Sequence, residues 1–224
     1  MIDVAWGNFI AAFAAFFASH MILIRPPVKP VIVRVLTHRG FSAAYSLLSI
    51  LILWWLIDAA GSAPYVELWS WAPWQNWIPR ISMLPACLIL TLGVATPNPF
   101  SFGGMHNSSF DPKHPGIVRY VRHPILLSAA LWSVAHIPPN GNLAHVVLFG
   151  TFALFSLLGM KLVDRRRRHE MNEEWLRLQR LVKAAPHGIV MRSNAFQIRV
   201  LWGFLLYGVL VGLHPVLTDI DPFA

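Results

Sequence analysis

Residues 142–168 form the stretch NLAHVVLFGTFALFSLLGMKLVDRRRR. Most of the residues from Asn142 to Val163 are apolar, and the charged run Asp164–Arg168 follows directly. A helix that crosses a lipid bilayer needs about 17–25 mainly apolar residues. Basic residues gather where a membrane helix meets the cytoplasm. The stretch therefore predicts a membrane-spanning helix that ends at the cytoplasmic face.

The composition of the whole chain agrees with lipid as its solvent. Of its 224 residues, 56% are hydrophobic and only 12% are charged, whereas soluble domains carry about 25% charged residues. Cys87 is the single cysteine, which excludes an intramolecular disulfide framework and a cysteine-based zinc or iron–sulfur site. Asp3 stands where a cleaved signal would carry basic residues, so we expect the first segment to remain in the mature protein.

Five further apolar segments share this pattern, although the fourth segment of the chain is short. Pro and Gly residues separate the segments, as they do at helix boundaries. The sequence predicts an all-α fold, in which residues 1–224 form one polytopic bundle of about six transmembrane helices. The five segments are Asp3–Ile24, Phe41–Ala60, Ile81–Thr96, Pro124–Ile137 and Ile198–Thr218.

The basic residues predict the orientation of these helices. All but one of the 18 Lys and Arg residues lie in the loops Arg25–Gly40, Pro97–His123 and Lys161–Arg199, which alternate along the chain. Only Arg80 lies elsewhere. The positive-inside rule places these loops in the cytoplasm and both termini on the other side of the membrane. The basic excess is thus a topology signal rather than a nucleic-acid site.

The stretch Asp164–Lys183 alternates Trp175, Leu176, Leu178 and Leu181 with arginine and lysine. This pattern predicts an amphipathic helix on the cytoplasmic surface, with membrane lipids and their anionic headgroups as its partners. Asp164 itself could orient a histidine or pair with Arg122 or Arg165, and structural pairing is the favoured role.

Histidines are the residues most able to carry chemistry in this chain. Four of the ten lie within or at the ends of apolar segments, namely His20, His123, His136 and His214, and His145 is a possible fifth. An ionisable side chain inside a membrane is costly and usually faces the bundle interior. Neutral imidazole ligates metals, but zinc and di-iron sites need further ligands that this chain lacks. Haem needs only one or two axial side chains.

The segment Gly116–Pro124 joins a polar loop to an apolar helix. Pro124 suits the first helical turn, and His123 then lies near the positive helix end. A neutral histidine at this position could ligate a metal, donate to a ligand or bind an anion, so Arg122 and His123 are candidate catalytic residues. Arg25 and Arg119 could pair with haem propionates, or could simply belong to the cytoplasmic charge.

Taken in order, a series of short motifs resembles the NnrU family, which includes 15-cis-zeta-carotene isomerase. Each motif is weak alone, but their order and spacing extend over essentially the whole chain. They are Phe17-Ala18-Ser19-His20, Pro26-Pro27, Thr96-Pro97-Asn98-Pro99, Gly116-Ile117-Val118-Arg119, Arg122-His123-Pro124, Leu131-Trp132 with Ala135-His136, Asn140-Gly141-Asn142, Asp164-Arg165-Arg166 and His214-Pro215.

The resemblance implies a multi-helix membrane protein and, for the isomerase branch, a b-type haem with two axial histidines that match His20 and His136. In that branch, haem reduction frees one histidine and exposes the iron for cis–trans isomerisation of a polyene. The bacterial branch is linked to denitrification, where it accompanies nitrite and nitric oxide reductases. The resemblance therefore implies haem b iron as cofactor, and a lipophilic polyene, nitric oxide or denitrification enzymes as partners. The Pro-Asn-Pro loop and the short length are similar to the bacterial branch, which implies a bacterial inner membrane with both termini in the periplasm.

Helix depth favours a different pairing of the histidines. His136 lies roughly 20 Å along its helix from His123, at ~1.5 Å per residue. By depth alone, His20 would meet His123, and His136 would meet His214. We keep His20 and His136 as the expected haem ligands, with His123 as the first substitute.

Two other functions remain open at this stage. Arg122-His123-Pro124, followed by a helical hairpin and a charged stretch, is similar to the isoprenylcysteine carboxyl methyltransferases, which bind S-adenosylmethionine. The downstream Gly-x-x-Tyr-x-x-Tyr pattern of that group is absent, since Glu173–Leu178 stands in its place. A non-enzymatic accessory protein for nitrogen-oxide reductases is the third possibility.

Overall fold

The computed structural model describes residues 4–186 and 194–223, and its regular elements in these ranges are helices. The chain divides into two compact units. The first unit runs to Trp69 and also takes in Asn142–Leu148, whereas the second comprises the rest. Helix α5 (Leu143–Met171) begins in the first unit and continues in the second.

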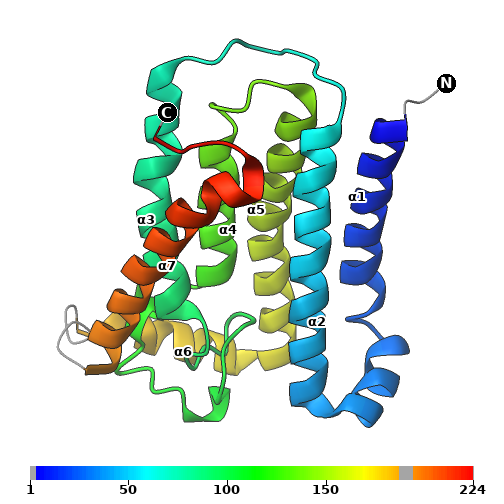
Figure 1. Ribbon diagram of the computed structural model, residues 1–224. Coiled ribbons are helices and arrows are strands. Elements are labelled where there is room, and N and C mark those ends of the chain that lie inside the picture. The colour runs from blue at the N-terminus through cyan, green and yellow to red at the C-terminus, as the bar shows by residue number, and fades with distance from the viewer. Residues whose placement is uncertain (1–3, 187–193, 224) are drawn as a thin grey trace. The chain divides into compact units, whose positions relative to one another are not determined.

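The first unit is built on two apolar helices that pack side by side, α1 (Val4–Ile22) and α2 (Val28–Ser62) (Figure 1). Phe9 and Phe16 of α1 are buried, as is Leu56 of α2. Within this apolar contact, the indole Nε1 of Trp55 donates to Asn8 Oδ1 at 3.0 Å. The bond satisfies two polar groups that lipid could not satisfy.

Helix α2 begins well before the predicted segment Phe41–Ala60 and is interrupted once. Residues 28–36 are helical, but Thr37 has the non-helical angles φ 63° and ψ 169°. The Thr37 hydroxyl then accepts the backbone N–H of Gly40 at 3.3 Å, as residues at helix starts do. The expected cytoplasmic loop Arg25–Gly40 is therefore mostly a short helix, which the sequence analysis missed.

Helix α3 (Trp77–Gly93) is central to the second unit, where it contacts α4 (Pro124–His136) and α7 (Asn194–Thr218). Glycine permits both contacts. A Cβ added at Gly93 would lie 2.1 Å from the Pro124 Cβ, and one at Gly203 of α7 would lie 2.7 Å from a Leu88 methyl. These distances are far shorter than van der Waals contact, so the helices approach as closely as their backbones allow.

Helix α5 does not end at the charged run but carries it. The helix continues through Asp164 to Met171, and Asn172, with φ 49° and ψ −123°, separates it from α6 (Glu173–Ala184). The apolar face of α6 packs on protein, because Trp175, Leu178 and Val182 are buried against Phe100 and Val118. Two of the four apolar residues that predicted contact with lipid, Trp175 and Leu178, are therefore buried in protein, whereas Leu176 is 49% exposed.

Four of the helices in the described ranges are long and apolar enough to cross a membrane, namely α1, α2, α5 and α7. Helix α4 has 13 residues and α3 has 17, which confirms a short fourth apolar segment. The all-helical membrane fold is thus confirmed. Six crossings and periplasmic termini stay predictions.

Arg80, the one basic residue outside the predicted cytoplasmic loops, has a structural role. Its guanidinium carbon lies 5.0 Å from the ring centroid of Trp77 and 5.1 Å from that of Phe223. Its Nε donates to the Pro222 carbonyl, and its own carbonyl accepts the Tyr207 hydroxyl at 3.1 Å. Arg80 therefore fastens the C-terminal segment and α7 to the start of α3.

Candidate functional site: a closed polar cluster and two helix-bound histidines

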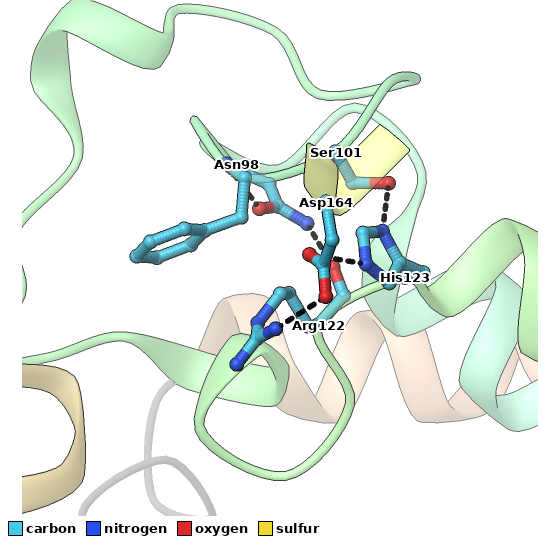
Figure 2. Close-up of polar contacts among 6 residues, drawn as sticks. Asn98, Ser101, Arg122, His123 and Asp164 are labelled. Carbon is cyan, nitrogen blue, oxygen red and sulfur yellow. Dashed lines mark hydrogen bonds and ion pairs between the residues drawn. The ribbon is translucent and has the colours of Figure 1, made fainter. Parts of the chain in front are cut away.

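A polar cluster forms in the second unit, where the loop before α4 meets α5. His123 directly precedes α4, Asp164 lies on α5, and Asn98 and Ser101 come from the loop after α3 (Figure 2). Asn98, Ser101 and His123 are almost fully buried. The cluster therefore joins segments distant in sequence through groups that solvent barely reaches.

Both ring nitrogens of His123 are engaged by side chains. Nε2 lies 2.9 Å from Asp164 Oδ1, and Nδ1 lies 2.9 Å from Ser101 Oγ. Burial lowers the pKa of His123 below its ordinary value, although the Asp164 charge opposes this shift. A neutral His123 must keep its proton on Nε2, because a carboxylate only accepts. The Ser101 hydroxyl then donates to Nδ1.

Arg122 binds the other oxygen of the same carboxylate. Its Nη1 donates to Asp164 Oδ2 at 2.7 Å, so Asp164 bridges two consecutive residues of the loop. The Arg122 guanidinium lies 5.4 Å from the Trp175 ring centroid, and the Arg122 carbonyl accepts the Asn98 amide at 2.9 Å. The prediction that Asp164 pairs with Arg122 is confirmed, and Asp164 orients His123 as well.

The two arginines proposed for haem propionates lie in different surroundings. Arg119 donates through Nη1 to the carbonyls of Val182 and Lys183. These carbonyls belong to the last turn of α6, where the backbone has no hydrogen-bond donors within the helix. Arg25 is exposed in the turn between α1 and α2. Arg119 thus holds α6 in place, while Arg25 stands at the end of the helix that carries His20.

His20 and His136 are held in the same way. Nδ1 of His20 donates to the Phe16 carbonyl at 2.9 Å, and Nδ1 of His136 donates to the Trp132 carbonyl at 2.7 Å. Each acceptor lies four residues earlier on the same helix. A carbonyl only accepts, so the Nδ1–H tautomer is favoured and the lone pair lies on Nε2. The two residues lie in separate units, His20 in the first and His136 in the second.

Aromatic rings surround both imidazoles. The ring of Phe16 lies 4.2 Å from that of His20, with Tyr45 at 5.6 Å. Phe149 lies 5.2 Å from His136, with Trp132 at 5.8 Å. These rings restrict the orientation of each imidazole within its helix.

His214 lies at the far end of the second unit from His123. Its Nδ1 donates to the Ile220 carbonyl at 2.8 Å. His214 and His136 are near enough to interact electrostatically, as helix depth predicts for this pair. Within the second unit, the structure therefore brings Arg122 together with His123. It also brings His136 close enough to His214 for an electrostatic interaction.

The model of the NnrU protein family matches residues 8–222 of the chain. The chain belongs to the NnrU family. Neither a curated protein nor a solved structure matches it.

The sequence analysis missed two residues of the cluster in this NnrU family member. Asn98 was noted only within a motif, and Ser101 was not noted at all. Asn98 Oδ1 accepts the backbone N–H of Phe100 at 3.1 Å, so it shapes its own loop as well as holding the Arg122 carbonyl. Asn98 could have been recognised from its position between Pro97 and Pro99. Prolines donate no backbone hydrogen bond, so the side-chain amide of Asn98 stands out as the group that can donate there.

The described ranges of this NnrU protein contain no group of three or more His, Cys, Asp or Glu residues that could hold a metal ion. These residues could therefore supply only one or two ligands to a metal ion, and its remaining ligands would have to come from another group. Haem iron, whose porphyrin supplies four nitrogens, needs only axial side chains from the protein.

Proposed function

We propose that this NnrU family member is a b-type haem protein of the bacterial inner membrane, associated with denitrification, with His20 and His136 as the axial ligands of the iron. One observation carries the proposal: both imidazoles donate Nδ1–H to a carbonyl of their own helix. Metal-bound histidines usually make this bond through the nitrogen that does not ligate. The donor set therefore fits a haem iron bound through Nε2.

His123 fits this role less well than His20 and His136. Asp164 and Ser101 occupy its two ring nitrogens, so metal binding at His123 would have to displace one of them. In the proposed protein, Arg122 and His123 hold the loop against α5. They would act on a substrate only after Asp164 releases them.

The surroundings of the two ligands support the same proposal. Phe16 and Tyr45 beside His20, with Trp132 and Phe149 beside His136, provide flat apolar surfaces that suit a porphyrin. Arg25 is better placed than Arg119 to meet a propionate, because Arg119 binds carbonyls of α6.

When bound, the haem would supply one-electron redox chemistry and a site for nitric oxide or a polyene double bond. The protein's own residues would orient the two imidazoles so that the lone pair of each ring lies on Nε2. The Nδ1 bonds to the Phe16 and Trp132 carbonyls would hold each imidazole in its orientation. The chemistry proposed for the bound haem is redox-gated and resembles either the isomerase branch of the family or the handling of nitric oxide.

The test is the absorption spectrum of the protein purified after expression with ample haem, oxidised and reduced, with and without nitric oxide. We expect a bis-histidine spectrum. His20→Ala and His136→Ala should each convert it to a mono-histidine spectrum, and the double variant should lose the haem. His38→Ala, which removes an exposed histidine of α2, is the matched control.

Other outcomes would change or remove the proposal. Wild-type protein without a Soret band would overturn haem binding. A bis-histidine spectrum in the double variant, lost instead with His214→Ala or His123→Ala, would overturn the ligand assignment alone. Unchanged nitrite and nitric oxide reductase activity in a deletion strain would contradict the link to denitrification.

One feature of the fold supports the similarity of Arg122-His123-Pro124 to methyltransferases. Helices α4 and α5 form a hairpin, and α6 follows them in the chain. Calorimetric titration with S-adenosylmethionine separates this alternative from the haem proposal. Binding without a Soret band would favour a methyltransferase, and the absence of binding would exclude it.

A further inference from the structure

The first part of α2, residues 28–36, is a short helix with exposed apolar side chains. Val31 is 61% exposed and Val35 is 78% exposed. They stand four positions apart, so they lie on one face of the helix. Thr37 then breaks the helical geometry, which sets this segment apart from the long apolar helix that follows.

Basic side chains border this apolar face. With 3.6 residues per turn, Arg34 falls about 80° from the middle of the face that carries Val31 and Val35, and Lys29 falls about 140° from it, toward the far side of the helix. Arg25 precedes the segment and Arg39 follows it. An apolar face between flanking cations is typical of a helix that lies in the headgroup region of a membrane.

The charges of this segment are not neutralised by carboxylates. Among the residues that the structure describes, Arg25, Lys29, Arg34 and Arg39 form no ion pair, and Lys29 instead lies 5.5 Å from the Phe41 ring centroid. The sequence has no Asp or Glu between Asp3 and Asp58. The segment therefore presents an uncompensated cluster of four positive charges.

Three of the basic residues of α5 and α6 differ in this respect. Arg166 and Arg167 bind Glu170, and Arg177 binds Glu174. These arginines carry their own counter-charges, whereas those around residues 28–36 require counter-charges from outside the unit.

We propose that residues 28–36 bind anionic phospholipids, with Val31 and Val35 inserted among the acyl chains and the flanking cations in contact with phosphate groups. The combination of features selects lipid over an acidic soluble protein. An acidic soluble partner could neutralise the cations. The side chains of the two valines would then still contact water or the polar surface of that partner. A leaflet rich in anionic headgroups accommodates both the charge and the apolar face.

The first experiment is native mass spectrometry of the full chain, released from micelles with equal amounts of phosphatidylglycerol and phosphatidylcholine. We expect retained phosphatidylglycerol to exceed phosphatidylcholine. The variant Lys29→Gln/Arg34→Gln should lower this preference about fivefold for each lost cation. Arg166→Gln/Arg177→Gln removes the same charge from residues that already have carboxylate partners and should keep the preference.

A second measurement locates the helix. Val35→Cys, in a Cys87→Ser background, carries a fluorescent label into nanodiscs that contain brominated lipids. Quenching by brominated phosphatidylglycerol, stronger than by brominated phosphatidylcholine and weakened by Lys29→Gln/Arg34→Gln, is the expected result. Equal retention and equal quenching by the two lipids would overturn the anionic preference. A label that neither lipid quenches would overturn the membrane location and would favour an acidic protein partner.

Discussion

The two ends of α4 each present a histidine, and the two are held in different ways. His123, before the helix, is bound on both ring nitrogens by side chains from other segments. His136, at the other end, is bound on Nδ1 by the Trp132 carbonyl of its own helix. A histidine bound on both sides joins parts of the fold, whereas a histidine bound on one side by its own helix offers the other nitrogen to a ligand.

Asp164→Ala should have the largest effect on the His123 end. It removes the acceptor of both the His123 Nε2–H and the Arg122 guanidinium. Hydrogen bonds that involve a charged group contribute about 1.5–3 kcal/mol each, and the lower part of this range applies where water can reach the group. Asp164 is about a third exposed, so we expect a loss of about 2–3 kcal/mol in the free energy of unfolding.

Denaturation in detergent micelles would measure this loss. Asp164→Asn, which keeps an oxygen to accept from His123 but loses the ion pair, should fall between the wild type and Asp164→Ala. The haem spectrum expected from His136 should not change in either variant. If Asp164→Ala abolished that spectrum while the fold persisted, the separation of the two ends would be wrong.

Ser101→Ala should have a smaller effect at the same end. It leaves Nδ1 of the buried His123 without a donor, at a cost of about 1–2 kcal/mol. Ser109→Ala serves as the control, because the Ser109 hydroxyl donates to the His106 carbonyl at an exposed site and its loss should be nearly neutral. Equal stability of the two variants would show that the bond from Ser101 to His123 contributes little.

The pH dependence of stability should be the smallest effect. Burial lowers the pKa of His123 in the folded protein, while an unfolded histidine titrates near 6.5. The unfolded state therefore binds the proton more readily. The contribution of neutral His123 is full above about pH 6.5 and is lost as the pH falls through the lowered folded pKa.

Unfolding curves between pH 8 and pH 5, for wild type and His123→Gln, would measure this contribution. Asp164, Arg122 and Ser101 are the groups that face the ring, and the variant keeps all three. We expect the slope of stability against pH to be shallower in the variant. A variant with the wild-type slope would assign the pH dependence to other groups.

Much of the fold was predictable because its signals are local. The apolar length of α1, α5 and α7 and the short α4 follow from residue type and spacing, whereas Arg122 was only one of the partners that the sequence offered for Asp164. The early start of α2 was not, because β-branched valines and Pro30 in residues 28–36 are weak helix formers. The burial of Trp175 depends on Phe100, a loop residue that no periodicity connects to α6.

The candidate site was predictable to a lesser degree. Histidines stand out in an apolar chain, so His20, His123 and His136 were identified from composition. The way each ring is held was not predictable, because it depends on where Ser101 or the Trp132 carbonyl lies in space. Two histidines with the same sequence signal, at the two ends of one helix, thus have different environments.

The contact between α3 and α4 has a consequence for inheritance. A Cβ at position 93 would overlap the Cβ of Pro124, and every residue except glycine has a Cβ. While position 124 bears any side chain, position 93 admits no alternative to Gly93, whatever its polarity or size. The codon for position 93 can therefore change only after position 124 has itself become glycine, so the joint beside His123 has a fixed order of change.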